Sequence, residues 1–147
     1  MIGKIGNATE RSPCRPERTD GAVWVALCKA KLHCVNVTEA MLHYEGSVSI
    51  DRALLDAVGI LPFEIVQVTN LANGTLWRTY TIPAPAGSGV FCLNGPPARH
   101  FQVGDQAIVV STGYCEFDKV ANWTLRVAFV DQQNRLLRVG VETIPLA

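Results

Sequence analysis

The residues of this chain with the most distinctive chemistry are a neighbouring glycine and serine, Gly46 and Ser47. Glycine has no Cβ, so it tolerates strained backbone angles and leaves its carbonyl carbon open. The serine hydroxyl can attack that carbonyl and convert the amide into an ester. Elimination across the ester splits the chain after Gly46 and leaves dehydroalanine, which hydrolyses to a pyruvoyl group. Such a ketone forms a Schiff base with a substrate amine and accepts electrons as CO2 leaves.

A Gly-Ser step is not specific by itself, because the same pair recurs at Gly87-Ser88. From the dipeptide alone, the better interpretation is a turn before a capped helix. The surrounding sequence changes this interpretation. Lys31-Leu-His33 precedes the pair, an alternating segment follows over residues 34–42, and His43-Tyr-Glu-Gly-Ser47 leads into a helix start. In this context we interpret the pair as a processing site.

The elements that must position this pair are mostly short strands. Short apolar runs separated by Gly and Pro turns predict a mainly β domain, a small barrel with one or two short helices. Residues 1–22 are rich in Gly, Pro and Arg and lack periodicity, so we expect a mobile tail before a domain over 23–147. The predicted strands cover residues 23–27, 31–38, 63–68, 75–82, 90–93, 107–110, 125–130 and 136–141.

Three local signals are stronger than the rest. Side chains over residues 31–38 alternate, with His33, Val35 and Val37 against Leu32, Cys34 and Asn36, as in a half-buried strand. After the pair, Ser49 or Asp51 is expected to cap a helix that ends at a left-handed Gly59. Asn73-Gly74 predicts a hairpin turn. The apolar face of that helix would consist of Leu54, Leu55 and Val58.

Composition excludes several classes of partner. The 147 residues fit one domain, and the formal net charge of zero gives no reason to expect a nucleic acid or an anionic membrane as partner. No run approaches the ~20 apolar residues of a membrane span. The 5 cysteines are odd in number and form no CxxC pair, which predicts free thiols in a reducing, cytoplasmic compartment. Clustered metal ligands are absent, so no metal site is expected.

The stretch around Gly46-Ser47 resembles the self-processing site of the pyruvoyl-dependent aspartate 1-decarboxylases. The resemblance runs from about residue 23 into the last strands, in family order and spacing. It implies a double-psi β-barrel, usually a homotetramer with sites at subunit interfaces. It also implies a zymogen activated by self-cleavage, and conversion of L-aspartate to β-alanine and CO2 for pantothenate biosynthesis, without metal or pyridoxal phosphate. A need for a maturation factor stays open.

The motifs that carry the resemblance are His43-Tyr-Glu-Gly-Ser47, residues 54–61, Asn73-Gly74, Thr79-Tyr80 and Leu93-Asn94-Gly95.

The resemblance implies a role for each site residue. Ser47 becomes the pyruvoyl group, and Tyr80 donates a proton to the carbanion left by CO2. Thr79 polarises the carbonyl during processing and later contacts substrate, and Lys31 offers a cation near a substrate carboxylate. Asn94 steadies the site by hydrogen bonding, while His33 and Tyr44 line it. Seen alone, these residues also suit plain roles: strand residues, a satisfied barrel histidine and a solvated lysine.

Two departures from the family bear on substrate binding. Leu76 occupies the position of an arginine that would clamp a substrate carboxylate. After Gly95, Pro96 and Pro97 replace alanines whose N–H groups can bind carboxylate, and proline has no N–H. Such losses would cost roughly 3–6 kcal/mol of binding. Arg78 shares a strand face with Leu76 and Tyr80 at about 6.7 Å spacing, so it could reach the vacant position, and a solvated strand arginine is an equally good interpretation.

Three hypotheses follow. The first is an aspartate 1-decarboxylase. The second is a decarboxylase of the same mechanism that acts on a less acidic amino acid. The third is an unprocessed, non-catalytic barrel that serves as a binding or assembly subunit.

Overall fold

The computed structural model describes residues 21–145, so the predicted tail over 1–22 lies almost wholly outside the described residues. The described part is mainly β, as predicted, and contains one α-helix and two 3-10 helices. Its elements in chain order are β1 (Trp24–Asn36), β2 (Glu39–Met41), β3 (Ser47–Asp51), α1 (Arg52–Val58), β4 (Ile65–Asn70), β5 (Leu76–Ala84), β6 (Phe91–Asn94), η1 (Pro96–Arg99), β7 (Gln106–Glu116), η2 (Phe117–Asn122), β8 (Thr124–Val130) and β9 (Leu136–Thr143).

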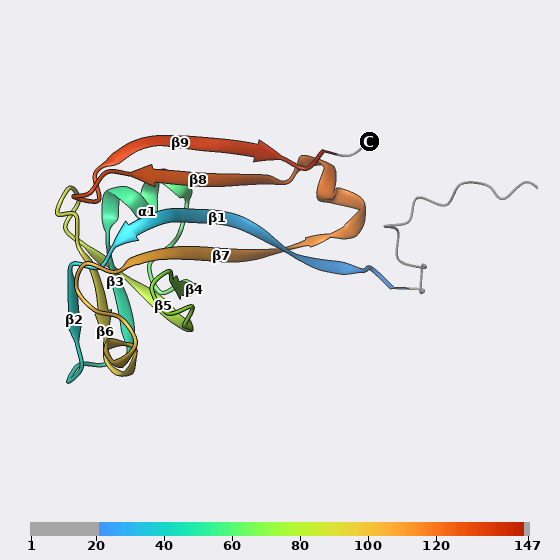
Figure 1. The fold of residues 1–147 in the computed structure, drawn as a ribbon. Helices are drawn as coiled ribbons and strands as arrows, with labels where there is room; N and C mark the ends of the chain where they lie inside the picture. The colour runs from blue at the N-terminus through green and yellow to red at the C-terminus, as the bar shows by residue number, and fades with distance from the viewer. Residues whose placement is uncertain (1–20, 146–147) are drawn as a thin grey trace, which may run out of the picture.

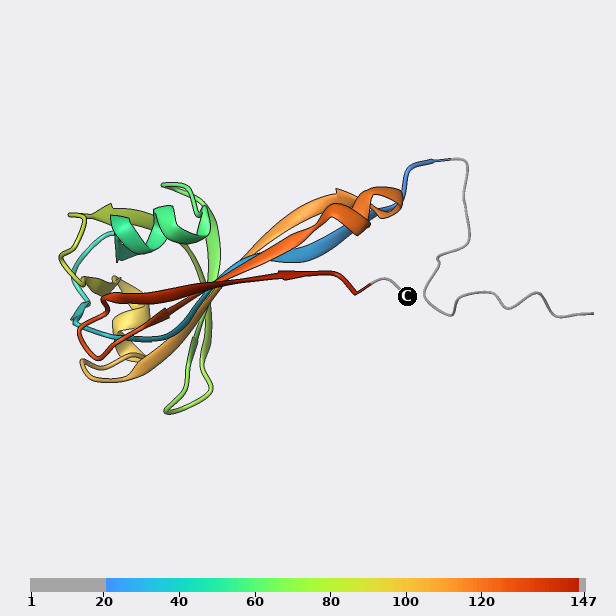
Figure 2. The ribbon, with the colours of Figure 1, turned by 90° about the horizontal axis from the view of Figure 1, so that it is seen from above.

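The strands form one mixed sheet in the order β2-β6-β3-β5-β4-β7-β1-β8-β9. The parallel pairs are β1–β8, β2–β6 and β3–β5, and the other pairs are antiparallel. In Figures 1 and 2 the sheet curls into a barrel-like body that carries α1, while one end of β1, β7, β8 and β9 projects from it as a long arm. The short strands β3 and β6 lie within the body, so the predicted processing pair is not on the arm.

The first strand differs from its prediction. Residues 24–36 form one strand instead of two, and the register between β1 and β7 shifts between Leu32 and Val35. Cys34 has a left-handed backbone with φ 56°. Because a bulge inserts a residue into one strand, side chains after it change face. Leu32 and Val35 are therefore both buried in the core, and the predicted uninterrupted alternation was wrong.

The helix after the pair is confirmed in its main features. Its N-cap is Asp51, whose carboxylate accepts the Ala53 N–H at 2.8 Å, and it ends at Gly59 with φ 78°. The alternative cap, Ser49, lies inside β3, a strand that the sequence analysis missed. The Asp51 carboxylate also accepts the N–H groups of Gly87 and Gly89 at 2.9 and 2.8 Å, so it ties the end of β3 to the loop before β6.

Buried asparagine side chains link elements that are distant in sequence. Asn134, in the β8–β9 turn, donates to the carbonyls of Asn36 and Gly89 at 2.8 and 2.9 Å and accepts the Asn36 N–H at 2.8 Å. Asn70 donates to the His100 carbonyl and the Asp105 carboxylate, each at 2.8 Å. These bonds hold the last hairpin and the loop after η1 against the body of the sheet.

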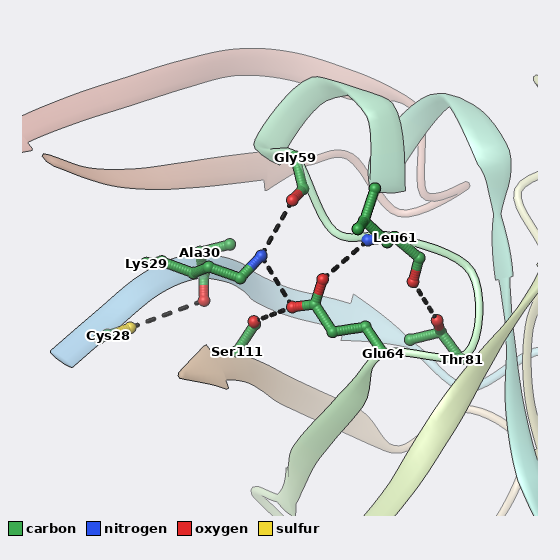
Figure 3. Close-up of polar contacts among 8 residues, drawn as sticks. All are labelled: Cys28, Lys29, Ala30, Gly59, Leu61, Glu64, Thr81 and Ser111. Carbon is green, nitrogen blue, oxygen red and sulfur yellow. Dashed lines mark hydrogen bonds and ion pairs between the residues drawn. The ribbon is translucent and has the colours of Figure 1, made fainter. Parts of the chain in front are cut away.

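A polar cluster fastens the loop after α1 to the sheet (Figure 3). The Glu64 carboxylate accepts the Leu61 N–H at 2.9 Å and the Ser111 hydroxyl, and it pairs with Lys29 at 2.8 Å. Lys29 also donates to the Gly59 carbonyl at 3.0 Å. Burial raises the pKa of Glu64, but these hydrogen bonds and the charge of Lys29 outweigh it and hold the pKa below its ordinary value.

We predict that Glu64→Gln lowers the free energy of unfolding at pH 7 by about 1–2 kcal/mol, because it removes a charged hydrogen-bond acceptor. A carboxyl group whose pKa is lower in the folded than in the unfolded protein stabilises the fold fully at pH values above its pKa in the unfolded protein. That stabilisation is lost as the pH falls through its pKa in the folded protein. Wild type should therefore lose more stability than the variant below the ordinary glutamate pKa of 4.5. Urea titrations at several pH values measure this.

The matched control is Asp56→Asn, which breaks the exposed Arg52–Asp56 pair at 2.7 Å. Exposed pairs of this kind contribute little, so this variant should stay within about 0.5 kcal/mol of wild type. If the free energy of unfolding fell equally with decreasing pH in wild type and Glu64→Gln, the Glu64 carboxylate would not stabilise the cluster through its charge.

Candidate functional site

The Ser47 hydroxyl is buried between strands and has a defined hydrogen-bond partner. Ser47 is the first residue of β3 and lies opposite Asn94, the last residue of β6. Both side chains are buried, at 0% and 3% exposure. The Asn94 Nδ2 donates to Ser47 Oγ at 2.9 Å. The structure therefore brings together two of the predicted processing residues, and the part of Asn94 in processing stays a prediction.

The carboxamide of Asn94 has further partners that the sequence analysis missed. Its second N–H is donated to Ser49 Oγ at 2.9 Å. The thiol of Cys92 donates to Asn94 Oδ1 at 3.2 Å. Cys92 lies two residues before Asn94 in β6, so the spacing of two in a predicted strand could have indicated a shared face. The partnership with Ser49 depends on the register of β3, and no local signal gave it.

Two glycines at the site are subject to different constraints. Gly95 has φ 80°, and a Cβ there would lie 2.9 Å from the Tyr44 carbonyl oxygen and 3.0 Å from Gly46 Cα. Only glycine lets the end of β6 approach residues 44–46 this closely. A Cβ at Gly46 would meet Pro96 Cδ at an ordinary 3.9 Å, and the Gly46 φ lies outside the left-handed region. Packing and backbone angle therefore do not require glycine at position 46.

Strand β5 carries the predicted Thr79-Tyr80 pair past the site. The parallel β3–β5 register begins at Val48, which pairs with Thr81, so Thr79 and Tyr80 directly precede the residue of β5 that pairs next to Ser47. Thr79 is on the buried side of β5. Tyr80 is half-buried, and its ring centroid lies 6.4 Å from that of Phe63. Thr79 and Tyr80 are consecutive in β5, so their side chains leave opposite faces of the strand, and their action on a group at residue 47 stays a prediction.

Other predicted residues lie further out. Tyr44 is 54% exposed and lines an open depression with His43 and Glu45, next to Gly46. The His33 ring packs against Phe129 of β8, with centroids 5.4 Å apart. No described contact joins His33 to Ser47, so its role there stays a prediction.

The two predicted cations have no fixed partner in the described part of the chain. Lys31 lies on β1 between β7 and β8, and Arg78 lies on the exposed side of β5. Within residues 21–145 neither side chain makes a hydrogen bond or an ion pair. Both ammonium and guanidinium groups are therefore free to meet an anion, although the structure holds neither of them at the Gly46-Ser47 step.

The two departures from the family pattern have clear structural settings. Leu76 is 57% exposed and shares the outer side of β5 with Arg78, as predicted. Pro96 and Pro97 begin η1, and the Ala98 N–H donates to the Gly95 carbonyl at 3.0 Å. The first N–H after Gly95 is thus already paired, and the two prolines offer none.

Residues 21–145 contain neither a metal-ligand cluster nor a membrane-spanning helix. No group of three or more His, Cys, Asp or Glu side chains in this range is arranged to hold a metal ion. No helix in the same range is long and apolar enough to cross a membrane.

The fold and this site define a mainly β protein that buries a serine after a glycine and binds its hydroxyl through an asparagine. Comparison with known proteins agrees with that class. A family model described as aspartate decarboxylase matches residues 23–137. The chain is 45% identical to the aspartate 1-decarboxylase of Carboxydothermus hydrogenoformans over 122 residues. This aligned region covers 83% of this chain and 96% of the relative.

Two further relatives bear the same name. The protein of Exiguobacterium sibiricum is 52% identical over 107 residues, 73% of this chain and 84% of its own length. The protein of Salinibacter ruber is 46% identical over 124 residues, 81% of this chain and 85% of its own length. The chain therefore belongs to the aspartate decarboxylase family.

We predict that Gly95→Ala destabilises the protein more than Gly74→Ala. Both positions have a left-handed backbone, φ 80° and 71°, so each alanine costs about 1 kcal/mol of strain. Space around Gly74 is open, whereas the new Cβ at Gly95 must displace residues 44–46, which adds about 1–3 kcal/mol. Denaturant unfolding measures both costs, and amide NMR shifts at residues 44–47 should change only in Gly95→Ala. Equal costs with unchanged shifts would contradict the close approach.

Proposed function

We propose that this chain is a pyruvoyl-dependent decarboxylase that converts L-aspartate to CO2 and β-alanine. The β-alanine would be used in pantothenate biosynthesis. One observation carries the proposal: in a member of the aspartate decarboxylase family, a buried serine follows a glycine, and the serine hydroxyl is hydrogen-bonded by Asn94. The relatives described above bear the name aspartate 1-decarboxylase.

Activation would proceed on the chain itself. Ser47 Oγ attacks the Gly46 carbonyl carbon, the C–N bond breaks, and an ester forms while the Ser47 nitrogen becomes a free amine. Loss of the Ser47 Cα proton and cleavage of its Cβ–Oγ bond leave Gly46 with a terminal carboxylate and residue 47 as dehydroalanine. Water then replaces the nitrogen, which leaves as ammonia, and the new chain begins with a pyruvoyl group. Thr79, on the buried side of the neighbouring strand β5, is proposed to polarise the carbonyl under attack.

The site residues suit the group that would form. The Asn94 N–H that now meets a hydroxyl would also suit a carbonyl oxygen at residue 47. When formed, the pyruvoyl group supplies a carbonyl that condenses with the substrate amine and accepts electrons as CO2 leaves.

The remaining roles belong to the chain's own side chains. Tyr80 would donate a proton to the carbon that has lost CO2, since a phenol is a suitable acid for a strongly basic carbon. Lys31 would bind a substrate carboxylate. The family resemblance further supports a homotetramer with sites at subunit interfaces, and the cysteine content supports a cytoplasmic location. Cleavage would proceed either unaided or with a maturation factor.

We predict that purified protein separates on intact mass analysis into residues 1–46 and residues 47–147, the latter with a pyruvoyl end. Ser47→Ala should remain whole and produce no β-alanine, because it lacks the attacking oxygen. Ser88→Ala removes the hydroxyl of the other Gly-Ser step and should cleave normally. A Ser47→Ala chain that decarboxylates aspartate at the wild-type rate would contradict the proposal, whereas a folded wild-type chain that stays whole would favour a non-catalytic barrel.

A second candidate is a decarboxylase of the same mechanism with a less acidic amino acid as substrate. Leu76 stands where the family resemblance places an arginine, and Pro96 and Pro97 offer no N–H to a carboxylate. Product assays with aspartate, leucine, methionine and glutamate distinguish the candidates. Aspartate turnover with no activity on the others would exclude the second one.

We predict that Leu76→Arg raises kcat/KM for aspartate about tenfold or more if carboxylate binding limits turnover, since a hydrogen bond to a charged group contributes about 1.5–3 kcal/mol. The control is Leu137→Arg on β9, which adds the same charge at another exposed leucine. A similar gain in both variants would indicate general electrostatic attraction. An unchanged value in Leu76→Arg would show that the leucine does not limit aspartate binding.

A further inference from the structure

We propose that Cys92 and Ser49 are positioning residues that hold the Asn94 carboxamide in the orientation that directs an N–H at Ser47 Oγ. Their effect is on the self-cleavage of Gly46-Ser47, so this inference rests on the proposed function. Neither side chain has to touch the Gly46 carbonyl. They act through the amide between them.

The strand register brings these side chains together. In the antiparallel β3–β6 pair Ser47 lies opposite Asn94 and Ser49 lies opposite Cys92. Side chains two residues apart share a face of a strand, so the four form a compact square across the two strands. Three hydrogen bonds connect them, at 2.9, 2.9 and 3.2 Å.

The thiol in this square favours one orientation of the amide, since each serine hydroxyl can accept or donate whereas sulfur is only a weak acceptor. A carboxamide has two N–H donors at one end and a carbonyl oxygen at the other. The N–H end of Asn94 faces two hydroxyl oxygens, and its oxygen faces the thiol of Cys92. Burial raises the pKa of Cys92 to about 11, the charge of Glu39 adds to the increase, and a backbone hydrogen bond near Met41 opposes it. The thiol therefore keeps its proton at neutral pH and serves as the donor.

The orientation matters for the attack by Ser47. When Oγ accepts from Asn94, one lone pair is occupied and the other is available for the Gly46 carbonyl. The hydroxyl proton is then free to pass to the Ser47 nitrogen, which leaves the carbonyl carbon as an amine. If the amide were turned over, Ser47 would donate its proton to the Asn94 oxygen, and an amide oxygen is too weak a base to take it. Cys92 disfavours that turned state because the amide N–H end would then face its sulfur, which is only a weak acceptor.

The test is the first-order rate of chain cleavage, followed by intact mass, in three cysteine variants. Cys92→Ala removes the donor and should slow cleavage about three- to tenfold, the effect of one hydrogen bond. Cys92→Ser supplies a hydroxyl donor and should restore the rate to within about twofold. Cys115→Ala is the matched control, since that thiol donates to the Glu116 carbonyl at the start of η2 and should not affect the rate.

Thermal unfolding of the same variants separates positioning from general stability. If Cys92 had only a packing role, both Cys92→Ala and Cys92→Ser would lower Tm. Serine would then not rescue cleavage, because its side chain would fill the space of the thiol no better than alanine. Equal cleavage rates in wild type and Cys92→Ala would overturn the proposal, as would equal slowing in Cys92→Ala and Cys92→Ser. Ser49→Ala should slow cleavage as well, since it frees the second N–H of Asn94, and an unchanged rate would remove Ser49 from the proposal.

An infrared measurement on uncleaved Ser47→Ala protein keeps this inference separate from the proposed function. The difference spectrum between Ser47→Ala and Ser47→Ala/Cys92→Ala isolates the S–H stretch of Cys92. A band shifted to lower frequency, which returns to the free position when Asn94→Leu is added, is the expected result. A band at the free position would overturn the proposal even if wild type cleaves. If the band is shifted but wild-type protein never cleaves, the result would contradict only the proposed self-processing and would leave the Cys92–Asn94 hydrogen bond supported.

Discussion

The pairing of β3 with β6 is the constraint on which the site depends, because it sets Ser47 opposite Asn94 inside the sheet. β3 has only five residues, so it needs support at both ends. At one end, Gly95 lets β6 pass close to residues 44–46. At the other end, Asp51 accepts three backbone N–H groups, which cap α1 and fix the loop before β6. A carboxylate with several N–H donors is a strong local tie, so the short strand has a defined register.

The buried asparagines show how the molecule divides structural from chemical tasks. Asn134 and Asn70 direct most of their hydrogen bonds to backbone groups of distant segments, and they complete the fold. Asn94 directs its side chain to two hydroxyls and a thiol. Buried polar groups must be paired, but backbone partners would satisfy that need equally well. A carboxamide surrounded by side chains that can exchange or donate protons is suited to chemistry, which agrees with a role at the Gly46-Ser47 step.

Local signals were enough to predict α1 and the hairpin at Asn73-Gly74, because a cap, a left-handed glycine and an apolar face all lie within a few residues. They were not enough for β3, which is too short to show a period, or for the bulge at Cys34. The partnership of Cys92 and Ser49 could not be predicted either, since it depends on register between strands far apart in sequence. Ser47, Thr79, Tyr80 and Asn94 were selected through the family resemblance, and the structure brings them to neighbouring strands.

Glycine at position 46 is informative because the fold does not demand it. Gly95 is required by both its φ and the atoms around it, and Gly59 by its φ at the end of α1. At Gly46 the φ is ordinary for any residue, and a Cβ would find only Pro96 Cδ at contact distance. A side chain there would nevertheless shield one side of the carbonyl carbon and stiffen the bond that must rotate during an attack. The reaction proposed for Ser47 explains this glycine, whereas a binding barrel that keeps its chain whole does not.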